Sequence, residues 1–542
     1  MSSFLVVGIG ILVVLGLIIF LRVNAFIALI VAALVVSFLA SDPLPEDGSE
    51  LTPTTMKERL ERVGKEFGSS AGKIGLVIGF AAVIGEAMMR SGAADRIVMA
   101  FLSLLGIKRA PWALMGSGFV LSVPVFFDTV FYLLVPLARS LYANTKKNFL
   151  LYVLAISAGG AITHTLVPPT PGPLFMADAL GVSVGMMMLV GGMVALPAAI
   201  AGIFVAGFLD KRVQIESLED KDETTGGIAR DLENAEPQQL SSPIPLWEAL
   251  LPVVLPVLLI SADTLVDTLK VKDVEAQVVQ VGDTVQAKVL KLNGKNAGKD
   301  EPAVSFAATE FSSAPKVGEI IHVTHAGAPE DGVKPAVAFK PNAWNARKPY
   351  STVIGNPGLV LLLSMTLALI TWVRWKKPGG KAFGAAVETA LLSGGLVILI
   401  TAAGGAFGAM LKLTGVGADI KELFQGNSEL GMTTLFLAFG MAALLKVAQG
   451  SSTTAMITVS GMMASFGMTE ADLGFNLVYI CTAIGAGSCM GSWMNDSGFW
   501  IVAKMSGLSE TEALKTWTPL LASLGVVSLV MTIILTKVMP LV

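Results

Sequence analysis

Charged side chains are scarce in this sequence of 542 residues, at 15% against the roughly 25% of a typical soluble domain. This scarcity argues against a soluble enzyme. The charges are also unevenly spread, because residues 210–236 hold 13 of the 79 and residues 267–350 hold 21. The remaining 431 residues carry 45 charges. Such a low density is typical of a membrane domain, here with room for about a dozen spanning helices of about 20 residues each.

Cysteine and histidine are also rare, and basic residues are not in excess. Cys481 and Cys489 are eight positions apart in one apolar segment, which on a helix is about 12 Å and too far for a disulfide. With His164, His322 and His325 as the three histidines, we expect no metal site and no cofactor. The net charge of −3 gives no basic footprint for nucleic acid. The sequence also lacks zinc-protease, Walker A and nucleophile-elbow motifs, so we expect no enzyme.

Apolar runs and polar gaps divide the chain into five parts. Period-two alternation with Gly-Asp and Asn-Gly turns predicts four to six strands in the second charge-rich stretch. Four basic residues within 372–381 place that loop in the cytoplasm by the positive-inside rule, which puts the acidic linker on the same side and the strands outside. The predicted parts are a first membrane repeat (1–208), an acidic cytoplasmic linker (209–246), a transmembrane helix (247–266), an inserted extracytoplasmic β domain (267–350) and a second membrane repeat (351–542).

The two hydrophobic parts contain a weak internal repeat. The glycine, the Ser/Thr-Gly pair and the isoleucine of 85–97 match those of 408–420 at a constant offset of 323. The same offset sets Asp128 opposite Ser451 and places a proline-rich break against a Gly/Asn-rich one. Corresponding interrupted segments in two halves indicate the binding site of a secondary transporter. We therefore predict an all-α polytopic membrane protein with broken helices.

Two polar interruptions in the first repeat are candidate substrate sites. Asp128, followed by Thr129, lies inside the apolar run VPVFFDTVFY, where a carboxylate usually faces a cavity, a partner or a substrate path. Thr163 and His164 precede four prolines within 168–173, which cannot continue a helix. Unwound backbone is tolerated in a membrane only where protein buries it or it lines a watery cavity. A paired carboxylate and a histidine bonded to backbone are the structural alternatives.

Two further interruptions lie in the second repeat. The hexapeptide QGSSTT at 449–454 separates two short apolar runs, so we expect a re-entrant hairpin with this polar tip at mid-depth. Its hydroxyls and free amides suit a carboxylate. Asn495 and Asp496, beside Gly498, supply amide donors, carbonyl groups and one ionisable carboxylate in an apolar region. An ordinary loop at 449–454 and a surface turn at Asn495 are the alternatives.

Six blocks of the sequence resemble the gluconate permease (GntP) family of bacterial sugar-acid transporters. The resemblance implies a multi-pass inner-membrane protein with inverted repeats and re-entrant hairpins, similar in fold to the wider ion transporter superfamily. It also implies proton-coupled uptake of gluconate or a related sugar acid. The linker and the insert look unlike compact members of the family. The blocks are SGAADRI (91–97), VPVFFDTVFYLLVPL (123–137), THTLVPPTPGP (163–173), GGAFGAML (404–411), QGSSTTA (449–455) and NDSGFW (495–500).

These residues combine into one binding hypothesis. We expect the substrate carboxylate to bind where the two hairpin tips and the two broken helices meet, and Asp128, His164 or Asp496 to take up the coupled proton. The expected partners are a small organic anion, a proton and the lipid bilayer, with a homodimer as the candidate assembly. Sodium coupling and a membrane sensor that uses the β insert are the alternatives. The expected binding residues are Asp128, Thr129, Thr163, His164, Pro169, Gly172, Gly450, Ser451, Ser452, Thr453, Asn495, Asp496 and Gly498.

Overall fold

The computed structural model divides into two compact units, residues 1–258 with 357–542 (unit 1) and residues 259–356 (unit 2). Most of the predicted acidic linker, residues 216–241, lies outside the described residues. The structure describes residues 2–21, 23–40, 55–145, 147–213, 215, 242–269, 273–280, 285–293, 320–323, 336–337, 343–416, 419 and 430–541.

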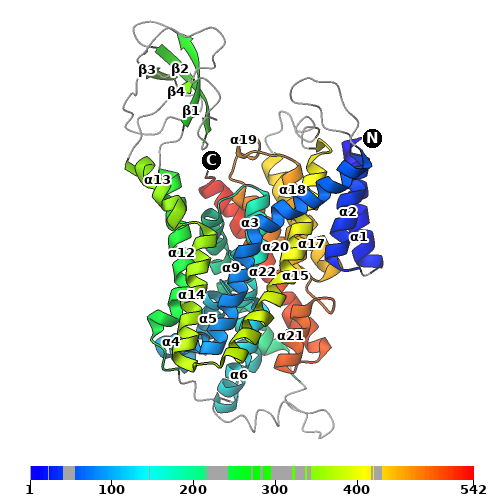
Figure 1. Cartoon of the computed structure of the whole chain (residues 1–542). Coiled ribbons are helices and arrows are strands. Elements are labelled where there is room, and N and C mark those ends of the chain that lie inside the picture. The colour runs from blue at the N-terminus through cyan, green and yellow to red at the C-terminus, as the bar shows by residue number, and fades with distance from the viewer. Residues whose placement is uncertain are drawn as a thin grey trace. The chain divides into compact units, whose positions relative to one another are not determined.

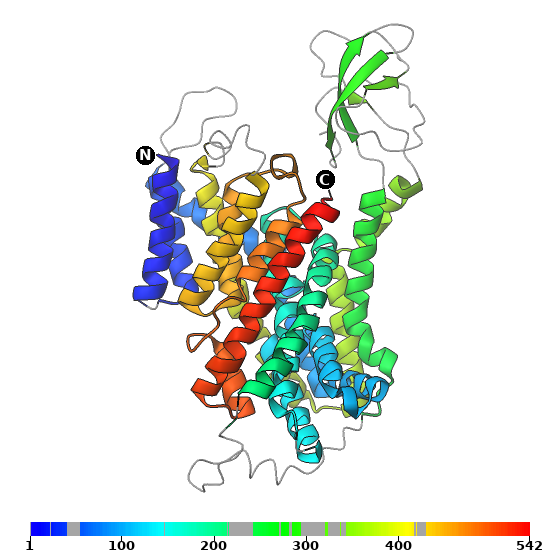
Figure 2. The same cartoon turned by 180° about the vertical axis from the view of Figure 1, so that it is seen from behind.

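Helices are the regular secondary structure of unit 1 in its described part (Figure 1; Figure 2 shows it from behind). Helix α12 (Leu246–Leu269) runs from unit 1 into unit 2, and α13 (Ala343–Ile354) belongs to unit 2. The other helices are α1 (Ser3–Leu15), η1 (Gly16–Phe20), α2 (Ala25–Leu39), α3 (Met56–Ser91), α4 (Ala93–Leu105), η2 (Ile107–Arg109), α5 (Ala110–Leu121), α6 (Phe127–Thr145), α7 (Phe149–Leu166), α8 (Pro171–Ala179), α9 (Val184–Arg212), α14 (Pro357–Lys376), α15 (Gly380–Lys412), α17 (Leu430–Gln449), α18 (Ser452–Ser465), α19 (Glu470–Leu473), α20 (Val478–Gly487), α21 (Ser497–Ser506) and α22 (Glu510–Val538).

Fewer helices span a membrane than the apolar runs predicted. The described residues contain eight helices that are long and apolar enough, or nine if α4 and α5, bent by 106° at their junction, form one span. The length of the chain left room for about a dozen. The described helices use less of that room, because α1, α2 and α20 are apolar but shorter than 18 residues.

The helices recur along the chain with the spacing that the sequence predicted. Helix α15 begins 324 residues after α3, α18 begins 325 residues after α6, and both α21 and α22 begin 326 residues after α8 and α9. Each start agrees with the offset of 323 within three residues. The repeat therefore extends from a few matching residues to the order and bounds of the helices.

Each half contributes a hairpin that ends inside unit 1. Helices α17 and α18 form one of them, since Thr434 near its open end lies 3.4 Å from the Met468 sulfur, and its tip is at Gly450. Helices α5 and α6 lie toward the opposite end of unit 1 (Figure 1) and are joined at 122–126. Helix α17 has 20 residues, enough to cross a membrane, so its predicted short flank is wrong.

The predicted β domain is wrong as a domain that fills 267–350. Both ends of that range are helical, because α12 continues to Leu269 and α13 begins at Ala343. Period-two alternation indicates extended backbone locally, but it does not establish a common core. The fold class is therefore corrected to a helical membrane protein with strands confined, in its described part, to four segments in the order β3-β2-β1-β4. They are β1 (Asp273–Gln280), β2 (Val285–Asn293), β3 (Ile320–Val323) and β4 (Ala336–Val337).

The beginning of α12 and the end of α14 lie at the same end of unit 1. The Trp375 indole donates to Glu248 at 3.1 Å, and Arg374 approaches the same carboxylate at 3.7 Å. The basic segment 372–381 covers the end of α14 and the beginning of α15. The cytoplasmic side of this end stays a prediction.

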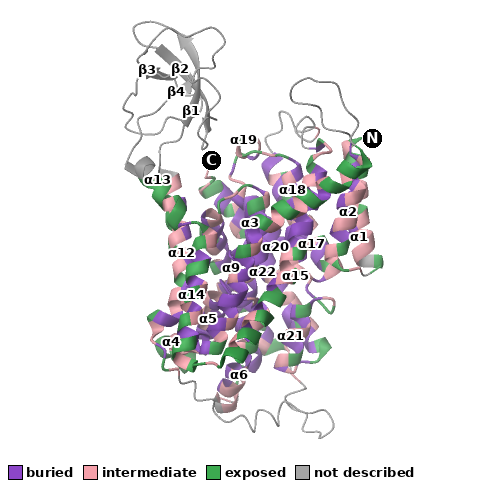
Figure 3. Ribbon diagram, in the orientation of Figure 1, coloured by how far each residue is buried: buried purple, intermediate pink, exposed green. Residues whose placement is uncertain are grey.

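Buried residues gather in the middle of unit 1, whereas large apolar side chains are exposed on its outer helices (Figure 3). Leu392 of α15 is 70% exposed and Phe204 of α9 is 66% exposed. A water-soluble protein buries such faces, but lipid accepts them. The outer surface of unit 1 is thus suited to a bilayer.

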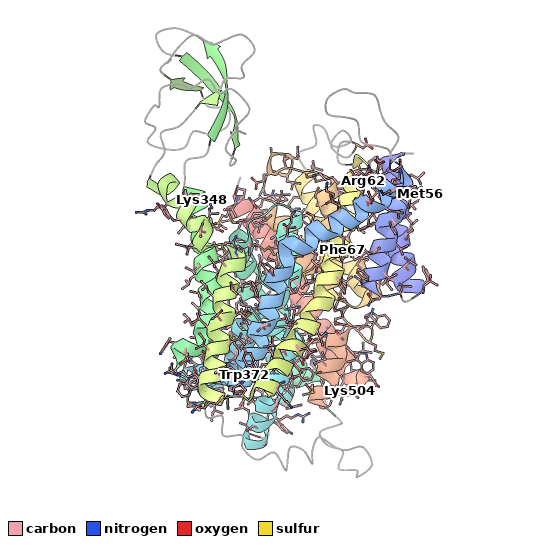
Figure 4. The ribbon with its side chains drawn as sticks, in the orientation of Figure 1. Met56, Arg62, Phe67, Lys348, Trp372 and Lys504 are labelled. Atoms are coloured by element: carbon pink, nitrogen blue, oxygen red, sulfur yellow. The ribbon has the colours of Figure 1, made fainter. Side chains whose placement is uncertain are left out.

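The N-terminal part of α3 holds α1 and α2 against the rest of unit 1. Phe67, labelled in Figure 4, packs edge-on against Phe26 of α2, with ring centroids 6.2 Å apart. The Arg59 guanidinium donates to the carbonyls of Ser37 and Phe38, both at 2.9 Å. A cation at the C-terminal carbonyls stabilises a helix end. The second cavity described below depends on this placement.

Candidate functional site

A cavity of about 440 Å³ lies in unit 1 where the broken helices meet. Its walls come from both halves of the chain, principally from α6, α7, α18, α21 and α22. Its size is within the range of about 300–1,000 Å³ that is usual for ligand pockets. The lining residues are Phe126, Phe127, Asp128, Thr129, Ala161, His164, Thr165, Ser393, Val397, Ser451, Ser452, Thr453, Cys489, Asp496, Ser497, Gly498, Trp517 and Leu521.

Three helix N-termini converge on this cavity. The first turns of α6, α18 and α21 supply lining residues, respectively Asp128, Ser452 and Ser497 with their neighbours. The first amides of a helix have no acceptor within the helix, and the macrodipole adds positive potential there. Such an end is a ready-made anion site. Three of them around one cavity favour a negatively charged ligand.

The sequence begins these helices inside the unit because it interrupts the preceding ones. Helix α5 ends at Leu121 before Pro124, and α7 ends at Leu166 before Pro168 and Pro169. Proline removes a backbone donor and clashes with the preceding turn. The bond between Pro168 and Pro169 is cis. The first break leads into α6, whose first turn lines the cavity, and the second ends α7 just after His164 and Thr165, which line the same cavity.

The tip of the α17–α18 hairpin packs backbone to backbone against the break that precedes α21. Gly450 has φ +81°, which side chains other than glycine rarely adopt. A methyl group there would overlap the Asn495 carbonyl and lie 2.9 Å from the Asp496 amide nitrogen. The Ser452 hydroxyl adds a hydrogen bond of 2.8 Å to the Ser488 carbonyl. The hairpin tip therefore packs this closely against the α21 break only in the observed conformation of the two segments.

Asp496 is fully occupied by hydrogen bonds and an ion pair. One carboxylate oxygen accepts from the Gly498 amide at 3.0 Å and so caps α21. The other accepts from Lys446 at 2.6 Å and from the Ser492 hydroxyl. Ser492 in turn accepts from the Trp517 indole at 2.7 Å. The carboxylate thus acts as a structural connection between α17, α21 and α22.

Lys446 is a candidate functional residue that the sequence analysis missed. Its side chain is 1% exposed, and its ammonium donates to the Gly450 carbonyl at 2.5 Å as well as to Asp496. A charged residue inside an apolar run is costly and usually functional. That rule singled out Asp128, and applied to the run 432–447 it would also have found Lys446.

Asp128 and His164 line the cavity from different helices. Asp128 has no hydrogen-bond or ion-pair partner among the described residues, although Lys446 and Asp496 are near enough to act on its charge. His164 lies edge-on to Phe126, with ring centroids 6.1 Å apart. Its Nδ1 is buried and has no partner in the described part of the chain. Asp128 and His164 are therefore available to interact with a ligand in the cavity.

The cavity brings together eight of the thirteen predicted residues. Thr163 is buried beside it with its hydroxyl unpaired among the described residues, and Gly172 packs against Met456. The eight are Asp128, Thr129, His164, Ser451, Ser452, Thr453, Asp496 and Gly498, and the lining does not include Thr163, Pro169, Gly172, Gly450 or Asn495. Residues without a local sequence signal, such as Ser393 and Trp517, join the lining from distant helices.

A second cavity, of about 620 Å³, lies on another side of the hairpin tip. Ser451 lines both cavities. Asn495 lines the second cavity, and its side-chain oxygen is buried without a partner among the described residues, as is the Gln449 amide nitrogen. The remaining lining residues are Ile18, Val23, Ala25, Ala448, Thr454, Trp493 and Met494.

Neither cavity has a ligand set for a metal in the part of the chain that the structure describes. No group of three His, Cys, Asp or Glu side chains is found there. Cys481 and Cys489 are buried free thiols, and Cys489 lies 3.4 Å from the Thr165 hydroxyl. The polar chemistry of the first cavity therefore comes from hydroxyls, helix amides, Asp128, His164 and the Asp496 carboxylate.

Comparison with known proteins gives both sequence relatives and a similar fold. The chain is 28% identical to the gluconate permease of Pseudomonas aeruginosa over 535 residues, covering 97% of this chain and 96% of the relative. It is 28% identical to the inner membrane permease YgbN of Escherichia coli, at 96% of both chains. The structure of MtrF from Neisseria gonorrhoeae, described as one of a class of antimetabolite efflux pumps, superposes with a TM-score of 0.54 at 13% identity, covering 94% of each chain.

The profile of one family, described as GntP family permease, matches residues 2–292 and 335–539. The match crosses 210–236 and reaches into the predicted insert, so the expectation that both segments depart from the family is too broad. The unmatched internal stretch is 293–334. With its apolar helices and an inner membrane permease among its relatives, the chain is a multi-pass inner-membrane transporter. It belongs to the GntP permease family.

Proposed function

We propose that this chain imports gluconate or a related small hydroxy-carboxylate by proton symport with alternating access. The observation that carries the proposal is the convergence of three helix N-termini on one cavity, because helix dipoles and the remaining first-turn amides stabilise a carboxylate. The relatives named gluconate permease support the substrate class.

The lining suits the two ends of a sugar acid differently. The carboxylate would sit at the first turns of α18 and α21, near Ser452, Thr453 and Ser497, because the Gly498 amide is already bonded to Asp496. The hydroxylated end would face other polar groups of the wall, among them Thr129 and Ser393. The Trp517 ring offers an apolar face to the C–H groups of the chain. Affinity would then depend on the carboxylate and selectivity on the hydroxyl pattern.

Asp128 is our candidate for the coupled proton, with His164 as its neighbour in the same wall. A carboxylate that lies unpaired beside a bound anion repels it, and protonation removes that repulsion. Asp496, the third predicted proton carrier, is already neutralised by Lys446 and caps α21. Its bonds make it the least suited of the three to exchange protons.

The position of the hairpin tip supports alternating access. Ser451 lines both cavities, so a movement of the tip would change the walls of both at once. Gly450 provides a backbone position where such a movement could begin. Rigid-body or hinge motion around a fixed site is the usual way in which transporters alternate.

Gluconate should raise the melting temperature of the purified protein, whereas sorbitol, which has similar hydroxyls but no carboxylate, should not. A protein that is stabilised equally by sorbitol would contradict the anion site.

In proteoliposomes an inside-alkaline pH gradient should drive gluconate accumulation, and a protonophore should abolish it. Accumulation that persists in the presence of the protonophore would contradict proton coupling.

Deletion of 270–347, with a short Gly-Ser linker in its place, should leave gluconate transport intact. The ends of this segment are held together within unit 2, because Lys348 pairs with Asp263 at 3.0 Å and Ser351 donates to the same carboxylate at 2.7 Å. The measurement is uptake by the deleted protein at matched expression. Loss of uptake by a correctly folded deletion variant would favour the sensor alternative, in which the function depends on the insert.

A further inference from the structure

Lys446 occupies a position chemically suited to a small metal cation. Its ammonium is 2.5 Å from the Gly450 carbonyl at the hairpin tip and 2.6 Å from an Asp496 carboxylate oxygen. A backbone carbonyl at a helix end and a carboxylate are the oxygen ligands that hard cations take. The lysine therefore places a covalently attached cation where other transporters could bind a free one.

The contacts of this ammonium connect two of the three helix ends at the first cavity. The Gly450 carbonyl precedes the first turn of α18, and Asp496 is the N-cap of α21. The side chain itself comes from the last turn of α17 and is buried. Without a cation between them, the carbonyl and the carboxylate would repel each other in a medium of low dielectric constant.

We propose that Lys446 is a positioning residue, a tethered cation that holds the α17–α18 tip against the α21 break and so makes anion binding independent of sodium. This inference rests on the proposed function, because the anion is the ligand that the positioned helix ends would receive. Two oxygen ligands would remain if the lysine were shortened. A monovalent metal ion could then take the place of the ammonium.

A purely structural ion pair predicts a different result. Its removal would weaken folding and binding equally in every salt, because no feature of a structural pair distinguishes sodium from another cation. A tethered cation predicts that shortening the side chain creates a sodium requirement that the wild-type protein lacks. Dependence on the identity of the salt cation is thus the deciding measurement.

Gluconate binding should be measured by calorimetry at fixed pH and ionic strength in sodium, lithium and choline chloride. We expect the wild-type affinity to agree within about twofold in all three salts. Lys446→Ala should bind at least about tenfold more weakly in choline and recover most of that loss in sodium or lithium. The matched control, Lys446→Ala with Asp496→Asn, lacks the carboxylate ligand and should be weak in every salt.

Three results would overturn the proposed role of Lys446 but leave the proposed function standing. They are wild-type binding that requires sodium, Lys446→Ala binding like wild type in choline, and Lys446→Ala binding that is equally weak in all salts. Failure of the wild type to bind gluconate in any salt would instead overturn the proposed function, and this inference with it. If Lys446→Ala does not fold, Lys446→Ser, whose short side chain also leaves the Gly450 carbonyl and Asp496 without the ammonium, provides the same salt comparison.

Discussion

Replacement of Asp128 by asparagine should abolish proton-driven accumulation of gluconate but preserve its binding. Asparagine has nearly the shape of a protonated aspartate, but it can neither bind nor release a proton. A pH gradient of one unit supports about tenfold accumulation for one coupled proton, and the variant should reach only the level outside the vesicle. Uptake into proteoliposomes under an inside-alkaline gradient measures this difference.

The pH dependence of binding should change in the same variant. In the wild type, lower pH should strengthen gluconate binding, because protonation of Asp128 removes a negative charge from the wall of the cavity. In Asp128→Asn the affinity should not vary with pH through this group. Asp178→Asn is the matched control, since Asp178 lies on α8, pairs with Lys73 at 3.8 Å and is not part of the cavity lining.

Accumulation by Asp128→Asn at the wild-type level would remove Asp128 from the coupling role. His164 would then be the next residue to change, because it shares the cavity and its Nδ1 has no partner among the described residues. A variant that binds no gluconate at any pH would instead assign Asp128 to substrate binding. The two measurements together therefore separate coupling from binding.

Interruptions of the helices could be predicted because their signals are local. Pro124, Pro168 and Gly450 each mark a break or a tip in the structure. Proline alone is a weaker signal, because Pro136 and Pro197 lie inside α6 and α9, so the clustering of the prolines and the polar neighbours of Gly450 carry the prediction. Asp128 was found for a similar reason, as a charge in an apolar run. Such residues indicate where a helix is interrupted, irrespective of the segments that pack against it.

The partners across the site could not be predicted in the same way. Ser393 and Trp517 sit in ordinary apolar helices and reach the cavity only because α15 and α22 pack around it. Asp496 looked free in the sequence, but its position beside Lys446 and Gly498 turns it into a cap and an ion-pair partner. The β prediction failed in its extent, because alternation indicates where strands form but not where the flanking helices α12 and α13 end and begin.

Substitution of Gly450 by alanine should reduce gluconate uptake at least about tenfold, the largest effect that we expect from adding one methyl group. Left-handed backbone costs an ordinary residue roughly 1–2 kcal/mol, and here the methyl group would also overlap the Asn495 carbonyl. The backbone strain and the steric overlap would both weaken the contact between Gly450 and Asn495, which positions the hairpin tip beside the two cavities. Initial uptake rates at matched expression provide the measurement.

Gly474→Ala separates these two costs. Gly474 has a similar φ, +74°, but a methyl group there would have no atom within 4 Å, so this variant introduces the backbone strain without the steric overlap. It should transport at close to the wild-type rate. Equal impairment of both variants would mean that strain alone reduces transport and that the contact between Gly450 and Asn495 has no special role. Impairment of Gly450→Ala alone would show that substrate movement depends on how closely the hairpin tip approaches the α21 break.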